Sequence, residues 1–224
     1  MTELEAVYAR HSVRSYLDRR IEPDKLRLLN EKIADCNRRG RLRMTLLEDA
    51  AGTFGRLLNR AMGLSSAPSA IACAGTDDAT LDERVGYYGE QIVLYAQTLG
   101  LNTCWAGTFS AKRVPLRLAE GERLVIVIAV GYGAQQGKAH RSKPIDQLGA
   151  GSDHLPAWFA EGLKLAALAP TAINQQKFEF HLNDDGTVKA VDRGGPFSRV
   201  DLGIVKYHFD LGRASAGRSE TFPL

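Results

Sequence analysis

The sequence predicts an α+β fold in which helices dominate and several short strands lie between them. Three observations support this prediction. Apolar residues follow helical spacing over 82–99, and seven consecutive apolar residues at 124–130 form a strand covered on both faces. Phe178 and Phe180 alternate with polar neighbours, as in a half-buried strand. Such a mixture of helices and strands is typical of the α+β class.

The first half of the chain contains signals for two helices, a strand and a third helix, in that order. Pro23 begins a helix that Gly40 ends, and 46–62 is expected to form a weaker helix. A buried strand follows over 68–74. The helix at 82–99 is the clearest, because its apolar stripe repeats at steps of three and four residues. Its stripe consists of Val85, Tyr88, Ile92, Tyr95 and Leu99.

Gly100 is suited to end that helix in a left-handed conformation, and a short strand follows over 102–105. The second half contains a helix that Pro156 begins and that ends at Ala169-Pro170. A hairpin turn at 183–186 joins the strand at 177–182 to a strand at 188–191, and an apolar-rich helix covers 200–212.

Composition and charge limit the class of protein. The 224 residues are 44% hydrophobic and 25% charged, as in ordinary globular chains, and the net charge of +3 suits a small phosphorylated ligand better than a nucleic acid. The longest apolar run is far too short to span a bilayer, and the first residues are too charged for a signal peptide. Three widely separated cysteines favour a reduced compartment, so we expect a cytoplasmic protein without a membrane partner.

The common motifs of catalysis are absent from the sequence. It contains no GxGxxG, GxxxxGK[ST], GxSxG, HExxH or CxxC, and its five histidines show no metal-ligand spacing. We therefore predict no metal site and assign no catalytic residue. His208, beside Tyr207 on an apolar helix, has the pattern of a satisfied core histidine. An enzyme with this sequence needs a bound organic cofactor.

Two basic clusters could bind a phosphate. Arg10, Ser12 and Arg14 alternate in a short segment, so two guanidiniums and a hydroxyl could face one ligand. Arg141 and Lys143 follow the strand at 124–130 and its Gly-Tyr-Gly turn and add two cations. Taken singly, each cluster fits a solvated basic turn better than a ligand site.

Two further segments could contact a flat ligand. Residues 169–177 lie between a helix and a strand, and Asn174 has both a donor and an acceptor for the polar edge of a flavin or nucleobase. The alternative is a capped loop in which Asn174 satisfies nearby backbone. Residues 104–107 are short and apolar, and Gly107 could expose a backbone N–H.

Together these segments resemble the FMN-dependent nitroreductase family over most of the chain. The resemblance rests on the Arg-x-Ser-x-Arg at 10–14, the Leu-Gly-Leu-Asn-Thr-Cys-Trp-Ala-Gly at 99–107, the strand-Gly-Tyr element at 127–132 and the Arg-Ser-Lys-Pro at 141–144. It implies a mixed or antiparallel sheet wrapped by helices, with the backbone of 106–107 facing flavin N5. The FMN-binding residues it implies are Arg10, His11, Ser12, Arg14, Ala106, Gly107, Arg141, Lys143, Pro170, Thr171, Ala172 and Asn174.

One departure from the family pattern indicates a pseudo-duplicated chain. The usual Ala-Pro-Ser-x-x-Asn loop is missing after the first helix, and its counterpart APTAIN lies at 169–174, with Gln176-Lys177 in place of Pro-Trp. Residues 92–100 and 204–212 match at five of nine positions. The resemblance therefore implies a nitroreductase-like half at 1–150 and a pseudo-repeat at 151–224 that completes the FMN cleft, in a monomer that mimics the usual homodimer.

The implied activity is ping-pong electron transfer from NADH or NADPH, through FMN, to electron-poor acceptors such as nitroaromatics or quinones. A flavin-binding storage or sensing protein without turnover is the main alternative. The basic run at 37–43 suggests a nucleic-acid-binding module, but it has no interleaved aromatic residues, and a solvated helix end explains it more simply.

Overall fold

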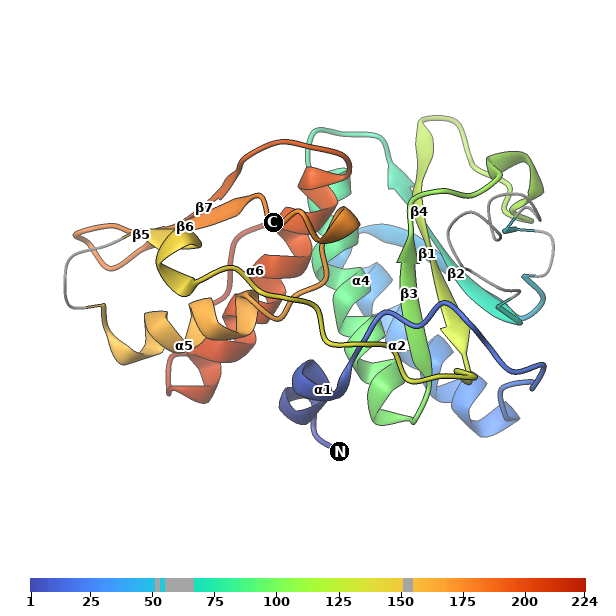
Figure 1. The fold of residues 1–224 in the computed structure, drawn as a ribbon. Helices are drawn as coiled ribbons and strands as arrows, with labels where there is room; N and C mark the ends of the chain where they lie inside the picture. The colour runs from blue at the N-terminus through green and yellow to red at the C-terminus, as the bar shows by residue number, and fades with distance from the viewer. Residues whose placement is uncertain (51–52, 55–66, 151–154) are drawn as a thin grey trace. The chain divides into compact units, whose positions relative to one another are not determined.

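The computed structural model describes residues 1–50, 53–54, 67–150 and 155–224 (Figure 1). The chain forms two compact units, and each is described by itself. Unit 1 comprises Met1–Leu81 and Gln91–Ala139, and unit 2 comprises Asp82–Glu90 and His140–Leu224. The division into a nitroreductase-like half at 1–150 and a pseudo-repeat at 151–224 stays a prediction.

Unit 1 is built on a four-stranded antiparallel sheet in the order β1-β2-β4-β3. Its strands are β1 (Leu42–Leu47), β2 (Ser69–Thr76), β3 (Asn102–Ala106) and β4 (Glu122–Gly131). The predictions of strands at 68–74, 102–105 and 124–130 are confirmed. The long apolar run is buried because β4 is an inner strand, paired with β2 on one side and β3 on the other.

The predicted helix at 46–62 is wrong at its start, where Leu46 and Leu47 belong to β1. They pair with Ile71 and Ala70 of β2. Leu42 and Met44 are buried, so the alternation of β1 places one face of the strand against the core. Residues 51–52 and 55–62 of that prediction lie outside the described residues.

The helical elements among the described residues of unit 1 pack with this sheet in the same compact unit. These are α1 (Glu3–Ala9), α2 (Pro23–Gly40), the second half of α4 (Leu81–Thr98) and the 3₁₀ turn η1 (Ala111–Arg113). Thr2 and Glu5 form a capping box at the start of α1. The predictions of α2 and α4 are confirmed, and Gly100 ends α4 with φ of 76°. The described helices include none long and apolar enough to cross a bilayer.

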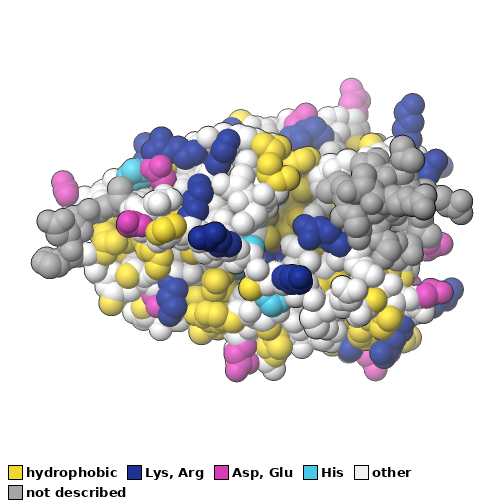
Figure 2. Space-filling view, in the orientation of Figure 1, with side chains coloured by type: hydrophobic (Ala, Val, Ile, Leu, Met, Phe, Trp, Pro, Cys, Tyr) yellow, Lys and Arg dark blue, Asp and Glu magenta, His cyan; other side chains and the backbone are white. Residues whose placement is uncertain are grey.

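The basic run at 37–43 lies at the junction of α2 and β1, where its charges meet carboxylates. Arg38 and Arg39 form ion pairs with Asp35, and Arg43 pairs with Glu122. Figure 2 shows one face of the molecule, on which lysine and arginine side chains lie scattered among neutral and apolar atoms. The local pairing favours the interpretation of this run as a solvated helix end.

The described part of unit 2 contains a smaller sheet and two packed helices, besides residues 82–90 of α4. The strands β5 (Gly149–Ala150), β6 (Phe178–Leu182) and β7 (Val188–Asp192) lie in that order, with β5 parallel and β7 antiparallel to β6. The helices are α5 (Ala157–Ala166) and α6 (Ser198–Ser215), and the 3₁₀ turns are η2 (Ile145–Gln147) and η3 (Ala172–Asn174). The predicted helices and hairpin of this region are confirmed.

Aromatic rings form the core of unit 2. The rings of Phe180 and Phe209 stack with centroids 4.5 Å apart, and the rings of Phe159 and Phe222 meet Phe209 edge-on at 5.4 and 5.8 Å. These residues come from α5, β6, α6 and the C-terminal segment. The alternation of Phe178 and Phe180 therefore does place one face of β6 against a core.

The first half of α4 crosses α6 at a contact made by two glycines. A Cβ atom at Gly86 would lie 2.0 Å from the carbonyl oxygen of Val200 and 3.0 Å from the nitrogen of Ile204. A Cβ atom at Gly203 would lie 2.0 Å from the carbonyl oxygen of Glu83 and 2.6 Å from the nitrogen of Tyr87. The backbones touch directly, so neither position accepts a side chain without separation of the helices.

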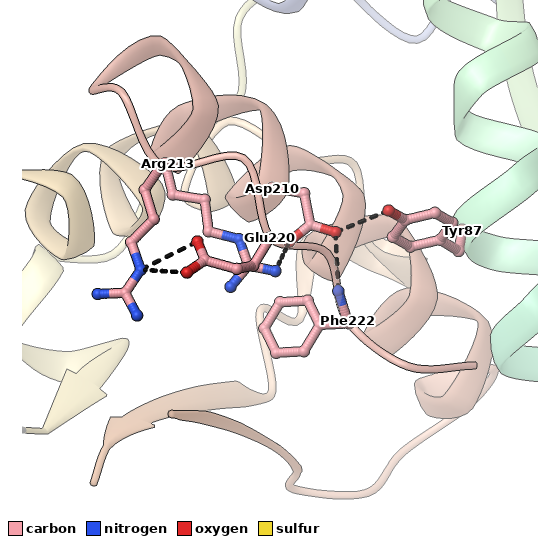
Figure 3. Close-up of polar contacts among 6 residues, drawn as sticks. Tyr87, Asp210, Arg213, Glu220 and Phe222 are labelled. Carbon is pink, nitrogen blue, oxygen red and sulfur yellow. Dashed lines mark hydrogen bonds and ion pairs between the residues drawn. The ribbon is translucent and has the colours of Figure 1, made fainter. Parts of the chain in front are cut away.

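Polar pairs join the same two helices around this contact. The Tyr87 hydroxyl donates to Oδ2 of Asp210 over 2.7 Å, and the backbone N–H of Phe222 donates to the same oxygen over 3.2 Å (Figure 3). Arg213 lies 2.6 Å from Oδ1 as an ion pair without hydrogen-bond alignment. Burial raises the pKa of Asp210, and the Tyr87 bond and the Arg213 charge oppose that shift.

The glycine contact predicts a strong penalty for Gly203→Ala. We expect the free energy of unfolding to fall by about 3 kcal/mol, because the new methyl group meets backbone atoms that cannot rotate away. Gly162→Ala is the comparison variant, since its Cβ would lie 2.7 Å from the ring edge of Phe209, a side chain, and the nearest atoms are not backbone. Both changes gain the same helix propensity. Urea unfolding should show the larger loss for Gly203→Ala, and equal losses would contradict this contact.

Candidate functional site

In unit 1, the segment that contains Arg10–Arg14 extends along the edge strand β3. Ser12 forms a parallel bridge with Thr103, and the N–H of Val13 donates to the Thr103 carbonyl over 3.0 Å. Val13 is buried, whereas its neighbours Ser12 and Arg14 are half-buried and exposed. The segment is extended, so alternate side chains point the same way, as the sequence pattern predicts.

Arg10 and Arg14 differ in their surroundings. Arg10 ends α1 and is buried, whereas Arg14 is exposed and forms no ion pair with a described residue. Burial raises the pKa of the nearby Cys104 thiol, and the charges of Arg14 and Arg10 and a hydrogen bond with Ser12 oppose the shift. The Arg-x-Ser-x-Arg segment and the start of 104–107 are therefore neighbours in unit 1.

The other predicted residues of unit 1 lie close to this segment in the fold. Ala106 is buried at the end of β3, opposite Val127 of β4, and the half-buried Gly107 follows it. His11 is half-buried, and a Cβ atom at Gly137 would lie 2.7 Å from the His11 Cβ. The chain after β4 thus passes directly beside the Arg10–Arg14 segment.

In unit 2, a buried amide joins the predicted cations to the predicted loop. Gln176 is only 3% exposed, and its Oε1 accepts from the N–H of Lys143 over 2.8 Å. Its Nε2 donates to the carbonyl of Arg141 and to Oδ1 of Asn174, both over 3.0 Å. The Lys143 ammonium donates to the Gln176 carbonyl over 2.8 Å. Arg141, Lys143 and Asn174 therefore form one cluster.

The Asn174 amide already has partners on both of its atoms. Its Nδ2 donates to the Arg141 carbonyl over 3.1 Å, and its Oδ1 accepts from Gln176. One N–H and one lone pair remain, and the side chain is exposed. The Arg141 side chain is exposed and forms no ion pair with a described residue. This cluster therefore presents to solvent the Arg141 guanidinium together with one N–H and one lone pair of the Asn174 amide.

The loop around Asn174 has an unusual backbone. Ile173, Asn174 and Gln176 adopt φ of 49°, 55° and 45°, in the left-handed region. The loop follows the buried Pro170, and the Thr171 hydroxyl accepts from the N–H of Gln176 over 3.1 Å. Left-handed backbone is unfavourable for residues other than glycine, and most of all for β-branched Ile173.

Asp201 in the first turn of α6 contacts the same loop. Both of its oxygens lie 3.0 Å from the backbone nitrogen of Ala172, and its Oδ2 accepts from Nε2 of Gln175 over 2.7 Å. Burial raises the pKa of Asp201 to about 6, although the bonds from Gln175 and Ala172 oppose the shift. The charge of Asp192 adds to the increase.

The structure thus collects the predicted residues into two sets, one in each unit. Unit 1 contains Arg10, His11, Ser12, Arg14, Ala106 and Gly107, and unit 2 contains Arg141, Lys143, Pro170, Thr171, Ala172 and Asn174. Sequence reasoning missed the connecting roles of Gln176 and Asp201. Gln176 lay inside a recognised motif, whereas Asp201 resembles any acidic residue in the first turn of a helix.

Comparisons with known proteins agree with this architecture. A model of the family described as "Putative TM nitroreductase" matches residues 3–213. A putative nitroreductase from Thermotoga maritima MSB8 shares 24% identity and a TM-score of 0.67, over 95% of this chain and 83% of that chain. A nitroreductase family protein from Streptococcus pneumoniae TIGR4 shares 16% identity and a TM-score of 0.53, over 65% of this chain and 98% of that chain. Curated proteins gave no match.

The fold is an α+β nitroreductase fold, and the protein is an oxidoreductase enzyme. Because the family model covers nearly the whole chain, the chain belongs to the nitroreductase family that the model describes.

Asp201 predicts a specific pH dependence of stability. Its pKa is raised from 3.8 to about 6, so its favourable contribution is complete below pH 3.8 and is lost as pH rises through 6. Asp201→Asn cannot ionise. The free energy of unfolding of the wild type minus that of the variant should therefore fall by ~1–3 kcal/mol between about pH 4.5 and 7.5.

Urea unfolding across that pH range measures this difference, and Asp185→Asn provides the control. The pKa of Asp185 is lowered by the Thr187 hydroxyl, so its contribution changes below pH 3.8 and stays constant in this range. A constant difference for Asp201→Asn would contradict the raised pKa.

Proposed function

We propose that the protein is an FMN-dependent oxidoreductase that takes electrons from NADH or NADPH. In ping-pong order it passes them to an electron-poor acceptor such as a nitroaromatic or a quinone. The main support is the family match over 3–213, which includes every segment that resembles an FMN-binding motif. When bound, FMN supplies the redox chemistry, which is why no protein nucleophile is needed.

The chemistry of the residues fits FMN. Arg14 and Arg141 are exposed cations without ion-pair partners among the described residues, as a phosphate site requires before its ligand binds. Asn174 has a donor and an acceptor left for the polar edge of the ring. Small residues at Ala106 and Gly107 allow a flat ring to approach the backbone.

Each residue has a distinct task in this proposal. Arg14 and Ser12 bind the phosphate and the pyrimidine edge, and Arg141 adds a second cation. Lys143 already donates to the Gln176 carbonyl, so it holds the loop and contributes charge. Asn174 orients the ring. We further propose that one chain binds one FMN as a cytoplasmic monomer, because the loop that a partner subunit usually provides is present at 169–174.

The spectrum of the purified protein tests the proposed function directly. We expect a yellow protein with one FMN per 24.5 kDa chain and a monomeric mass in light scattering. Anaerobic addition of NADH or NADPH should bleach the flavin, and a quinone should restore its colour. A flavin that stays oxidised with both donors would indicate storage or sensing instead. A protein that binds no flavin would contradict the proposal.

Replacement of Arg14 tests the phosphate assignment. Arg14→Ala should weaken FMN binding about tenfold or more, because a charge-assisted bond is lost. The stability of the FMN-free protein should not change, since Arg14 is exposed and has no ion pair with a described residue.

Arg27→Ala is a matched control, because Arg27 is an exposed arginine of unit 1 that pairs with Glu31 on α2, outside every motif. Titration followed by flavin fluorescence gives the affinities. Wild-type affinity in both Arg14→Ala and Arg141→Ala would show that the assignment is wrong.

A further inference from the structure

Asp201 is a buried carboxylate whose hydrogen-bond partners are uncharged groups. It is 6% exposed, and no described lysine, arginine or histidine forms an ion pair with it. Its partners are the N–H of Ala172 and the amide of Gln175, together with the positive end of α6. Both of these hydrogen-bond donors belong to the loop that contains Asn174.

The loop that Asp201 contacts needs external support. Ile173 and Asn174 are consecutive left-handed residues, and the Ile173 side chain is 86% exposed. Burial of an apolar side chain therefore does not compensate for this conformation. Contacts from the neighbouring residues must maintain it.

Asp201 holds both sides of this strained pair. Ala172 precedes Ile173 and Gln175 follows Asn174, and both donate to the one carboxylate. The Gln175 amide also donates to the Pro196 carbonyl over 2.9 Å. Its buried Oε1 has no hydrogen-bond partner among the described residues. The reversed amide would place that oxygen against the carboxylate, so Asp201 determines the orientation of Gln175.

We propose that Asp201 is a positioning residue of the FMN site, which fixes residues 172–175 so that Asn174 meets the flavin ring in one orientation. This inference rests on the proposed function. Asp201 acts through Ala172 and Gln175, and we do not assign it a contact with FMN. Its loss should alter the flavin environment as well as the loop.

Asp201→Asn is the sharpest variant, because it keeps the shape but loses the charge and one acceptor oxygen. At about pH 8 Asp201 is ionised in the wild type. In the FMN-free variant we expect hydrogen exchange at the Ala172 amide to accelerate about tenfold. The Kd for FMN should rise about tenfold, and the midpoint potential of bound FMN should shift.

Asp192→Asn is the matched control. Asp192 is a carboxylate at the end of β7 that contacts the start of α6, where Asp201 lies, but its partners are the Gly194 N–H and the Ser198 hydroxyl. This variant should keep the wild-type Ala172 exchange, FMN affinity and potential. Gln175→Met removes the side-chain amide, and with it the hydrogen bonds to Asp201 and to the Pro196 carbonyl, but it keeps the bond from Ala172 to Asp201. It should therefore reproduce part of the effect of Asp201→Asn. It is the second variant if Asp201→Asn does not fold.

The outcomes separate this inference from the proposed function. A wild-type protein that binds no FMN overturns both. A wild type that binds FMN, with Asp201→Asn or Gln175→Met of equal affinity and potential, overturns only the positioning role, even if the melting temperature falls. Shifts of equal size in Asp192→Asn would also overturn it, because they would reflect general loss of charge near α6.

Discussion

The direct backbone contact between α4 and α6 is the constraint on which the rest of unit 2 depends. Because Gly86 and Gly203 have no side chains, the first turns of α6 lie against α4 at the closest possible distance. The same approach brings Tyr87 within hydrogen-bond distance of Asp210 and His208 within 2.9 Å of Glu90. Asp201 lies in the first turn of α6, two residues before Gly203.

Charged side chains in the interior of unit 2 have polar partners, whereas two arginines of the candidate site have no ion pair with a described residue. Buried ionisable groups of unit 2 have partners close by, as a low-dielectric environment requires, and the His208–Glu90 pair is completely enclosed. At the surface, Arg14 and Arg141 have no carboxylate partner among the described residues. Surface arginines elsewhere, such as Arg27 and Arg38, do have one. Other exposed arginines outside the motifs, such as Arg199, also have no ion pair among the described residues, so the lack of a partner makes Arg14 and Arg141 available to an anionic ligand without marking them as its site.

Local patterns predicted most of this fold, because helix stripes, caps and buried runs are properties of neighbouring residues. Local patterns also mark α1 and β1, through the capping box Thr2–Glu5 and the alternation of Leu42 and Met44. The roles of Gln176 and Asp201 are different in kind. Asp201 meets Ala172 only after α6 has packed, so no pattern within either segment contains that information.

The residues that match in sequence between α4 and α6 are not the residues that occupy equivalent positions at the crossing of these helices. α4 covers 81–98 and α6 covers 198–215, and the glycine contacts exchange Gly86 with Gly203, so equivalent positions in this local two-fold lie 117 residues apart. The sequence matches lie at an offset of 112, and five residues turn a helix by about 140°. Those matches therefore occupy different faces of the two helices. A two-fold crossing of this kind requires one small residue at the contact point of each helix. Close packing of two helices explains such a pair of glycines without a duplication of the sequence. Evidence for a pseudo-dimer must consequently come from the flavin stoichiometry and the mass in solution, and the shared apolar stripe does not provide it.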